Sequence, residues 1–201
     1  MVTELIEGVA KFQTDVVPAK QALFDELATG QSPATLFITC ADSRVDPSLI
    51  TQTDPGDIFV VRNAGNIAPP LEANGSSPDG NAGSIEYAIS ALNVKHVIVC
   101  GHSGCGAMGG LQDLDAIAGA LPSVRRWLEH SESLLETPAV GDLDSLIEAN
   151  VMLQLEHLKT YPGVQAKLDA GEITLHGWVY DIGSGDVRAH NGETFESLLG
   201  G

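Results

Sequence analysis

The chain has 201 residues, with 10 lysines and arginines against 27 aspartates and glutamates, so its formal net charge is −17. Hydrophobic residues make up 43% of the chain and charged residues 18%, a balance typical of a folded protein and unlike that of an acidic disordered tail. Because so acidic a surface repels phosphate groups, we expect neither non-specific nucleic-acid binding nor docking on anionic membranes. The sequence shows no leader-like or membrane-spanning stretch, so a cytoplasmic protein is expected.

The apolar residues are spaced as in a protein that alternates helices and strands. Residues 1–29 are predicted to form a helical arm that Gly30 ends. The predicted strands and helices that follow are strands over residues 34–39, 58–61, 96–100 and 173–180, and helices over residues 84–92 and 145–160. Such alternation gives an α/β fold with a mainly parallel central sheet flanked by helices, in a single domain over residues 1–201. Turn-forming residues 183–186 are expected to add an antiparallel strand at the C-terminal edge.

Polar side chains follow three of these strands at the points where the strands end. The three segments are Cys40-Ala41-Asp42-Ser43-Arg44, Arg62-Asn63-Ala64-Gly65-Asn66 and Gly101-His102-Ser103-Gly104-Cys105-Gly106. Ligands of open α/β sheets bind at the carboxyl ends of the strands, so we expect the three segments to meet at one site.

The donor atoms in these segments suit zinc. Cys40, His102 and Cys105 form a Cys₂His set, and three protein ligands leave one tetrahedral position free, as in catalytic zinc sites. Three cysteines are too few and odd in number for a disulfide framework, and they fit a reducing compartment. Cys100 could face the same side as His102, but Gly101 is expected to end the strand. Cys100 is therefore interpreted as a buried thiol.

Two charged residues close to Cys40 are expected to complete the site. Zinc with two thiolates and one neutral imidazole has no net charge, so it is a weaker Lewis acid than zinc with three imidazoles and needs help from neighbouring groups. Asp42 either binds zinc itself or accepts a hydrogen bond from zinc-bound hydroxide. Arg44 can hold Asp42 off the metal through a bidentate contact, so the pair could open and close the fourth coordination position.

The strings CADSRVDP (40–47), VVRNAGN (60–66) and GHSGCGAMGG (101–110) resemble the β-class carbonic anhydrases. The similarity runs almost without gaps over residues 30–110, and the HGWVYDI segment extends it to about residue 185. C-x-D-x-R combined with a distant H-x-x-C is a highly specific pattern. The resemblance implies reversible hydration of CO₂ to bicarbonate and a proton by attack of zinc-bound hydroxide, with one zinc ion per chain.

The resemblance also carries the family's residue roles to matching positions of this sequence. They are the zinc ligands Cys40, His102 and Cys105, the catalytic pair Asp42 and Arg44, and the substrate-binding residues Gln31, Phe59 and Tyr87. Members of the family form intimate homodimers, often paired into tetramers, with active sites at the subunit interface. The helical arm over residues 1–29 is accordingly expected to pack on a partner subunit.

Other functions stay open on the sequence alone. A non-catalytic zinc-binding or regulatory module of the same fold would keep the thiolates without needing Asp42, Arg44 and Gln31 together. A relative acting on another linear heteroallene, such as CS₂, would share the zinc ligands and differ in access to the pocket. A cysteine phosphatase is disfavoured because residues 40–44 read C-x₃-R, whereas the phosphate-cradling loop is C-x₅-R.

Overall fold

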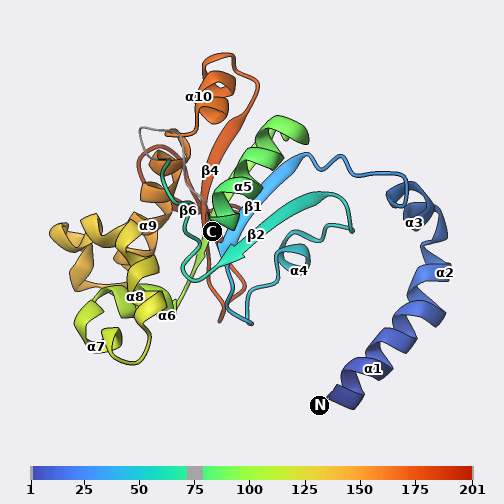
Figure 1. Cartoon of the computed structure of the whole chain (residues 1–201), viewed down its shortest axis with the longest axis horizontal. Coiled ribbons are helices and arrows are strands. Elements are labelled where there is room, and N and C mark those ends of the chain that lie inside the picture. The colour runs from blue at the N-terminus through green and yellow to red at the C-terminus, as the bar shows by residue number, and fades with distance from the viewer. Residues whose placement is uncertain (1, 72–78, 201) are drawn as a thin grey trace. The chain divides into compact units, whose positions relative to one another are not determined.

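The computed structural model describes residues 2–71 and 79–200 (Figure 1). The chain consists of two compact units, Met1–Ser32 and Pro33–Gly201. The first unit is helical throughout most of its length, with α1 (Val2–Lys11), the π-helical turn η1 (Phe12–Val16), α2 (Val17–Ala19) and α3 (Gln21–Leu27). One stripe of α1 is apolar and exposed, formed by Val2, Leu5, Ile6 and Val9.

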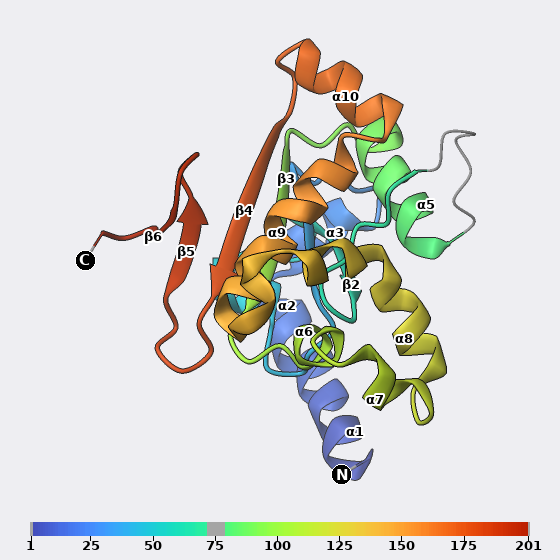
Figure 2. The same cartoon turned by 90° about the vertical axis from the view of Figure 1, so that its left-hand side faces the viewer.

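The second unit is built on a six-stranded sheet of order β2-β1-β3-β4-β5-β6. The strands are β1 (Thr35–Cys40), β2 (Ile58–Asn63), β3 (His96–His102), β4 (Thr174–Tyr180), β5 (Val187–His190) and β6 (Phe195–Ser197). Strands β1 to β4 are parallel, and β5 and β6 add antiparallel pairs at one edge (Figure 2). The predicted mainly parallel sheet with an antiparallel C-terminal edge is confirmed. Strand β6 was not predicted, because three residues carry no periodic signal.

Helices connect the strands of the second unit. They are α4 (Pro47–Thr51), α5 (Gly80–Glu86) with η2 (Tyr87–Ala91), α6 (Gly106–Leu111), α7 (Leu114–Ala118), α8 (Pro122–Leu128), η3 (Glu129–Glu136), η4 (Pro138–Gly141), α9 (Leu143–Leu158) and α10 (Pro162–Asp169). Asp46, Asp79, Asp113 and Asp142 cap α4, α5, α7 and α9 by accepting backbone N–H bonds. Part of the acidic composition therefore stabilises helix N-termini. Within the described ranges, no helix is both long and apolar enough to cross a membrane.

The main core lies between one face of the sheet and the helices. Leu36, Ile38, Val97 and Val99 from the two central strands pack there, and α9 runs along β3 and β4 on this side (Figure 2). On the opposite face, a smaller cluster contains Phe37, Ile98 and Cys100, with Trp178 and Tyr180 against it. Because β1 is buried on both faces, its apolar residues Leu36, Phe37 and Ile38 are consecutive instead of alternating with polar ones.

Strand β3 runs two residues beyond its predicted end, through Gly101 to His102. A Cβ atom at Gly101 would lie 3.0 Å from a methyl group of Ile147 and 3.0 Å from one of Val151, both on α9. The missing side chain of Gly101 lets α9 approach β3 closely, and the strand continues past this glycine. The prediction that Gly101 ends the strand was wrong.

Candidate metal centre

The ends of two adjacent parallel strands and the turn that follows bring two thiols and one imidazole together. Cys40 is the last residue of β1, and His102 is the last residue of β3. Cys105 follows a turn in which Gly104 has φ +63°, a left-handed conformation that glycine adopts easily. The Sγ atoms of Cys40 and Cys105 and a ring nitrogen of His102 lie within 4.8 Å of one another, and all three residues are buried.

The free atom of this group is a ring nitrogen. Nδ1 of His102 lies 3.0 Å from the carbonyl oxygen of Ser103, an arrangement in which Nδ1–H donates and Nε2 keeps its lone pair. Over the described part of the chain, Nε2 of His102 and Nδ2 of Asn66 are the only buried side-chain nitrogen or oxygen atoms without a hydrogen-bond partner. A metal ion would satisfy Nε2, and the Cys₂His donor set is one that zinc prefers.

The two thiols perturb each other. Contact with Cys105 holds the pKa of Cys40 well below its usual range, and contact with Cys40 raises the pKa of Cys105. The backbone N–H of Gly65 also donates to Sγ of Cys40 at 3.5 Å, which further favours the thiolate. Both sulfur atoms must be thiolates to bind a metal, so a divalent cation would displace any thiol proton of the pair on binding.

Asp42 lies beside the three donors, with Oδ2 3.9 Å from Nε2 of His102. Arg44 donates to both of its carboxylate oxygens, from Nε to Oδ1 at 2.9 Å and from Nη2 to Oδ2 at 2.7 Å. These hydrogen bonds hold the pKa of Asp42 well below its usual range, so the carboxylate is ionised. The predicted bidentate contact is therefore present. Nη2 of Arg44 also donates to the carbonyl oxygen of Gly104 at 3.2 Å, in the turn that precedes Cys105.

Arg62, on β2, holds the backbone that carries Cys40 and Asp42. Its Nε donates to the carbonyl oxygen of Cys40 at 3.1 Å, and its Nη2 donates to that of Asp42 at 2.8 Å. Arg62 belongs to a segment that the sequence predicts at the site, but this contact was not predicted. It depends on the pairing of Arg62 with Thr39 across the sheet, which one sequence does not reveal.

Two buried amide side chains on α9, Asn150 and Gln154, form hydrogen bonds with the backbone of the loop that follows β2. Asn150 Nδ2 donates to the carbonyl oxygen of Gly65 at 2.9 Å, and Gln154 Oε1 accepts from the backbone N–H of Ala68 at 3.0 Å. Gln154 Nε2 and the Ser131 hydroxyl donate to Oδ1 of Asn150, each at 2.9 Å. These residues were not predicted. The signal was available, because two amides spaced i, i+4 interrupt the predicted apolar face of the helix over residues 145–160.

Cys100 lies outside the Cys₂His group. It packs with Phe37 and Ile98, its thiol donates to the carbonyl oxygen of Gly101 at 3.4 Å, and burial raises its pKa to about 12. The structure places it as the buried thiol that the sequence predicted.

Two of the predicted substrate-binding residues, Phe59 and Tyr87, lie outside this group in a single chain. Phe59 and Tyr87 contact each other, with ring centroids 6.0 Å apart. Phe59 precedes Asn63 by four residues on β2, and Asn63 pairs with Cys40. At about 3.3 Å per strand residue, Phe59 therefore lies about 13 Å along the sheet from the level of Cys40. Gln31 belongs to the unit Met1–Ser32. The roles of these three residues stay predictions.

Comparisons with known proteins agree on one family. The carbonic anhydrase family profile matches residues 35–187. A carbonic anhydrase of Synechococcus elongatus is 46% identical over 192 residues, covering 92% of this chain and 70% of the relative. One of Pseudomonas aeruginosa is 45% identical over 196 residues, covering 94% and 87%. The solved structure of the β-carbonic anhydrase CcaA superposes with a TM-score of 0.93 at 41% identity, covering 98% of each chain. A tetrameric β-carbonic anhydrase of Sordaria macrospora superposes with a TM-score of 0.74 at 29% identity, covering 94% and 96%.

Proposed function

The chain belongs to the β-carbonic anhydrase family, and from that premise we propose that it catalyses the reversible hydration of CO₂ to bicarbonate and a proton. In this proposal Cys40, His102 and Cys105 hold one zinc ion per chain. The observation that carries the proposal is the buried Cys₂His group with Nε2 of His102 unpaired, next to an ionised carboxylate that an arginine holds in place.

A zinc ion in this set supplies Lewis acidity that lowers the pKa of water toward neutrality. The two thiolates would balance the charge of the ion. Activation of water would therefore depend more on neighbouring residues than it does at a zinc ion held by three imidazoles. With only Cys40, His102 and Cys105 as protein donors, such an ion would still be able to bind solvent or substrate. All three donors are buried, so water would screen the electrostatic interactions among the donors, the ion and Asp42 only weakly.

In this proposal, Asp42 is the hydrogen-bond acceptor that orients the nucleophile. Its Oδ2, 3.9 Å from Nε2 of His102, is at the edge of the donor set, and its low pKa keeps it ready to accept a proton in a hydrogen bond. An acceptor at this point directs an oxygen lone pair toward the carbon of CO₂. Arg44 occupies both carboxylate oxygens and so keeps Asp42 from becoming a fourth metal ligand.

The substrate pocket is proposed to form between subunits. Phe59 and Tyr87 of the partner subunit would supply its apolar wall, and the Gln31 amide would donate to the substrate oxygen as negative charge develops. Two exposed features support a homodimer, Tyr87 with 48% of its surface exposed and the apolar stripe of α1. The tetrameric relative supports pairing of such dimers. The proposed location is the cytoplasm, where the three free cysteines stay reduced.

Metal analysis and stopped-flow CO₂ hydration on the same preparations test this function. Wild-type protein should contain about one zinc per chain, and Cys40→Ser and His102→Ala should lose zinc and activity together. Cys100→Ala is the matched control, since this thiol lies in the other cluster, and it should keep both. A protein that holds zinc fully but does not hydrate CO₂ would contradict catalysis and favour a zinc-binding regulatory module. Activity retained in zinc-free protein would contradict the metal mechanism.

A further inference from the structure

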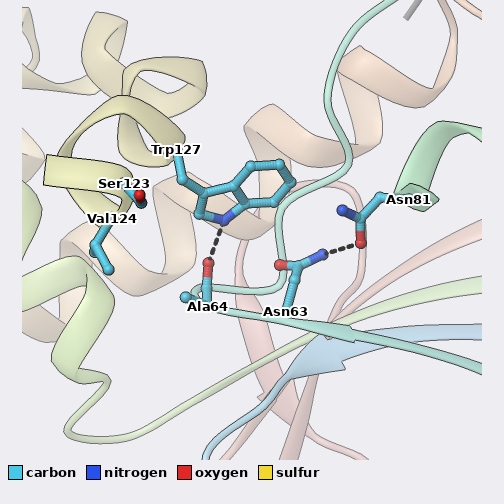
Figure 3. Close-up of a pocket in the computed structure, with 6 residues that line it drawn as sticks. All are labelled: Asn63, Ala64, Asn81, Ser123, Val124 and Trp127. Carbon is cyan, nitrogen blue, oxygen red and sulfur yellow. Dashed lines mark hydrogen bonds between the residues drawn. The ribbon is translucent and has the colours of Figure 1, made fainter. Parts of the chain in front are cut away.

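The peptide group between Ala64 and Gly65 is hydrogen-bonded at both ends. Its N–H, on Gly65, donates to Sγ of Cys40 at 3.5 Å. Its carbonyl oxygen, on Ala64, accepts from Nε1 of the Trp127 indole at 2.8 Å (Figure 3). In a trans peptide the N–H and C=O lie in one plane and point in opposite directions, and the described chain contains no cis peptide bond. The indole therefore aims this N–H at the thiol.

The neighbouring structure leaves this peptide little freedom to turn. Gly65 has φ +85°, and a Cβ atom there would lie 3.1 Å from the methyl group of Met108 and 3.2 Å from Cβ of Ala107, both on α6. The next carbonyl oxygen, that of Gly65 itself, accepts from Asn150 on α9. Trp127, on α8, supplies the remaining contact, so three helices fix the direction of one N–H.

We propose that Trp127 is a positioning residue of the zinc centre, acting on Cys40 through the Ala64–Gly65 peptide. This inference rests on the proposed function in that Cys40 must bind the metal. A hydrogen bond to a carbonyl polarises the peptide and strengthens its N–H as a donor. A stronger N–H bond to a thiolate withdraws electron density from the sulfur, so the sulfur donates less to the metal. Trp127 thus restores Lewis acidity to a centre whose two thiolates reduce it.

The indole also has a packing role that the experiment must separate from its N–H. Its ring meets the His130 ring edge-on, with centroids 5.3 Å apart, and it lines a surface pocket with Asn63, Asn81, Ser123 and Val124 (Figure 3). Phenylalanine keeps an aromatic ring at this position but has no N–H. Trp127→Phe therefore removes the hydrogen bond to Ala64 while retaining most of the apolar contact. The chain's second tryptophan, Trp178, provides a matched control because it packs against Phe37 in the cluster on the opposite face of the sheet.

Two measurements on the full-length chain test the proposal. The first is zinc affinity by competition with a chromophoric chelator. Trp127→Phe should raise the dissociation constant about tenfold, because the Gly65 N–H is no longer held in place to orient the Cys40 sulfur and this loss of preorganisation outweighs the gain in donor strength. The second is the absorption spectrum of the Co²⁺-substituted protein. Without the indole N–H, the hydrogen bond from Gly65 to Cys40 weakens and the Cys40 thiolate becomes a stronger donor, so its sulfur-to-cobalt charge-transfer band should shift to longer wavelength. Trp178→Phe should leave both the zinc dissociation constant and the cobalt band at wild-type values.

An isosteric replacement covers the case in which Trp127→Phe fails to fold. In a Trp178→Phe background, biosynthetic replacement of the remaining tryptophan by benzothienylalanine exchanges the indole N–H for sulfur with almost no change of shape. The same weakening and the same band shift would support the proposal. A dissociation constant and a cobalt band both unchanged in a protein that binds zinc would overturn it. Failure of wild-type protein to bind zinc would instead overturn the proposed function itself.

Discussion

The guanidinium group of Arg44 donates to both carboxylate oxygens of Asp42, at 2.9 Å through Nε and at 2.7 Å through Nη2. Oδ2 of the same carboxylate lies 3.9 Å from Nε2 of His102, at the edge of the donor set that would hold the metal. The contact with Arg44 therefore separates two possible uses of Asp42, as a hydrogen-bond acceptor and as a metal ligand.

Replacing Arg44 by alanine should close the zinc site. The freed Asp42 carboxylate should then ligate the metal, and CO₂ hydration should fall by about 100-fold or more because the acceptor is lost and the open position is filled. A crystal structure of the zinc-loaded variant shows the ligation directly. Arg125→Ala removes an exposed ion pair with Glu129 and is the control, with wild-type activity expected. An open fourth position at wild-type activity in Arg44→Ala would refute this role.

Replacing Asp42 by asparagine should separate metal binding from catalysis. Asparagine preserves the shape of the side chain but its Nδ2 cannot accept a proton or a hydrogen bond. We expect zinc content to stay at the wild-type level and CO₂ hydration by stopped-flow to fall by about 100- to 10,000-fold. Asp115→Asn, in the first turn of α7, provides the control. Full activity in Asp42→Asn would rule out its assignment as the acceptor.

Replacing Asn150 by alanine should destabilise the fold. The side chain is 1% exposed and serves the carbonyl oxygen of Gly65, the Ser131 hydroxyl and the Gln154 amide, all of which would lose a partner in the interior. We expect the free energy of unfolding to fall by about 2–4 kcal/mol. Urea denaturation of metal-free protein measures this without the contribution of zinc binding.

The matched control for Asn150 is Gln165→Ala, an exposed amide on α10 that donates to Asp169. Its removal should change the free energy of unfolding by no more than about 0.5 kcal/mol. If Asn150→Ala changed the free energy of unfolding as little as this control does, the buried Asn150 amide would not stabilise the fold.

His157 should make stability depend on pH. Burial lowers its pKa below the ordinary 6.5, and its Nδ1 lies near two acceptors, the carbonyl oxygen of Ala68 at 3.0 Å and Oε1 of Gln154 at 3.1 Å. As pH falls through about 6.5, the unfolded chain binds a proton at this residue that the folded chain does not, so folding loses stability. His157→Gln cannot take up that proton.

The measurement is the difference in free energy of unfolding between wild type and His157→Gln, followed from pH 8 to pH 5.5. Wild type should lose stability relative to the variant as the pH decreases, because only its unfolded state gains the proton. Other titrating groups cancel in the difference. A difference that stayed constant over this range would show that His157 titrates alike in both states.

The grouping of Cys40, His102 and Cys105 could be predicted because these residues lie at or just after strand ends. Cys40 and His102 end two apolar runs, and parallel strands must deliver their carboxyl ends to one edge. The wrong detail was Gly101, predicted to end β3, whose missing side chain instead admits α9. That close approach depends on how α9 packs on β3, and the residues next to Gly101 in the sequence do not indicate it.

The buried amides were missed for a related reason. A periodicity analysis treats polar side chains as exposed, yet Asn150 and Gln154 lie in the interior because the loop after β2 needs partners for its backbone groups. The Trp127 contact with Ala64 likewise depends on which helix crosses that loop. Spacing along α9 places the two amides on its apolar face, but it does not reveal which distant segments they or Trp127 contact.

The central claim is tested most directly by the CO₂ hydration rate of one preparation in three states: as purified, after removal of zinc by a chelator, and after zinc is added back. Catalysis through Cys40, His102 and Cys105 predicts that activity disappears with the metal and returns as about one zinc per chain is restored. A zinc-free protein that still accelerates hydration, or a zinc-loaded one that does not, would contradict it.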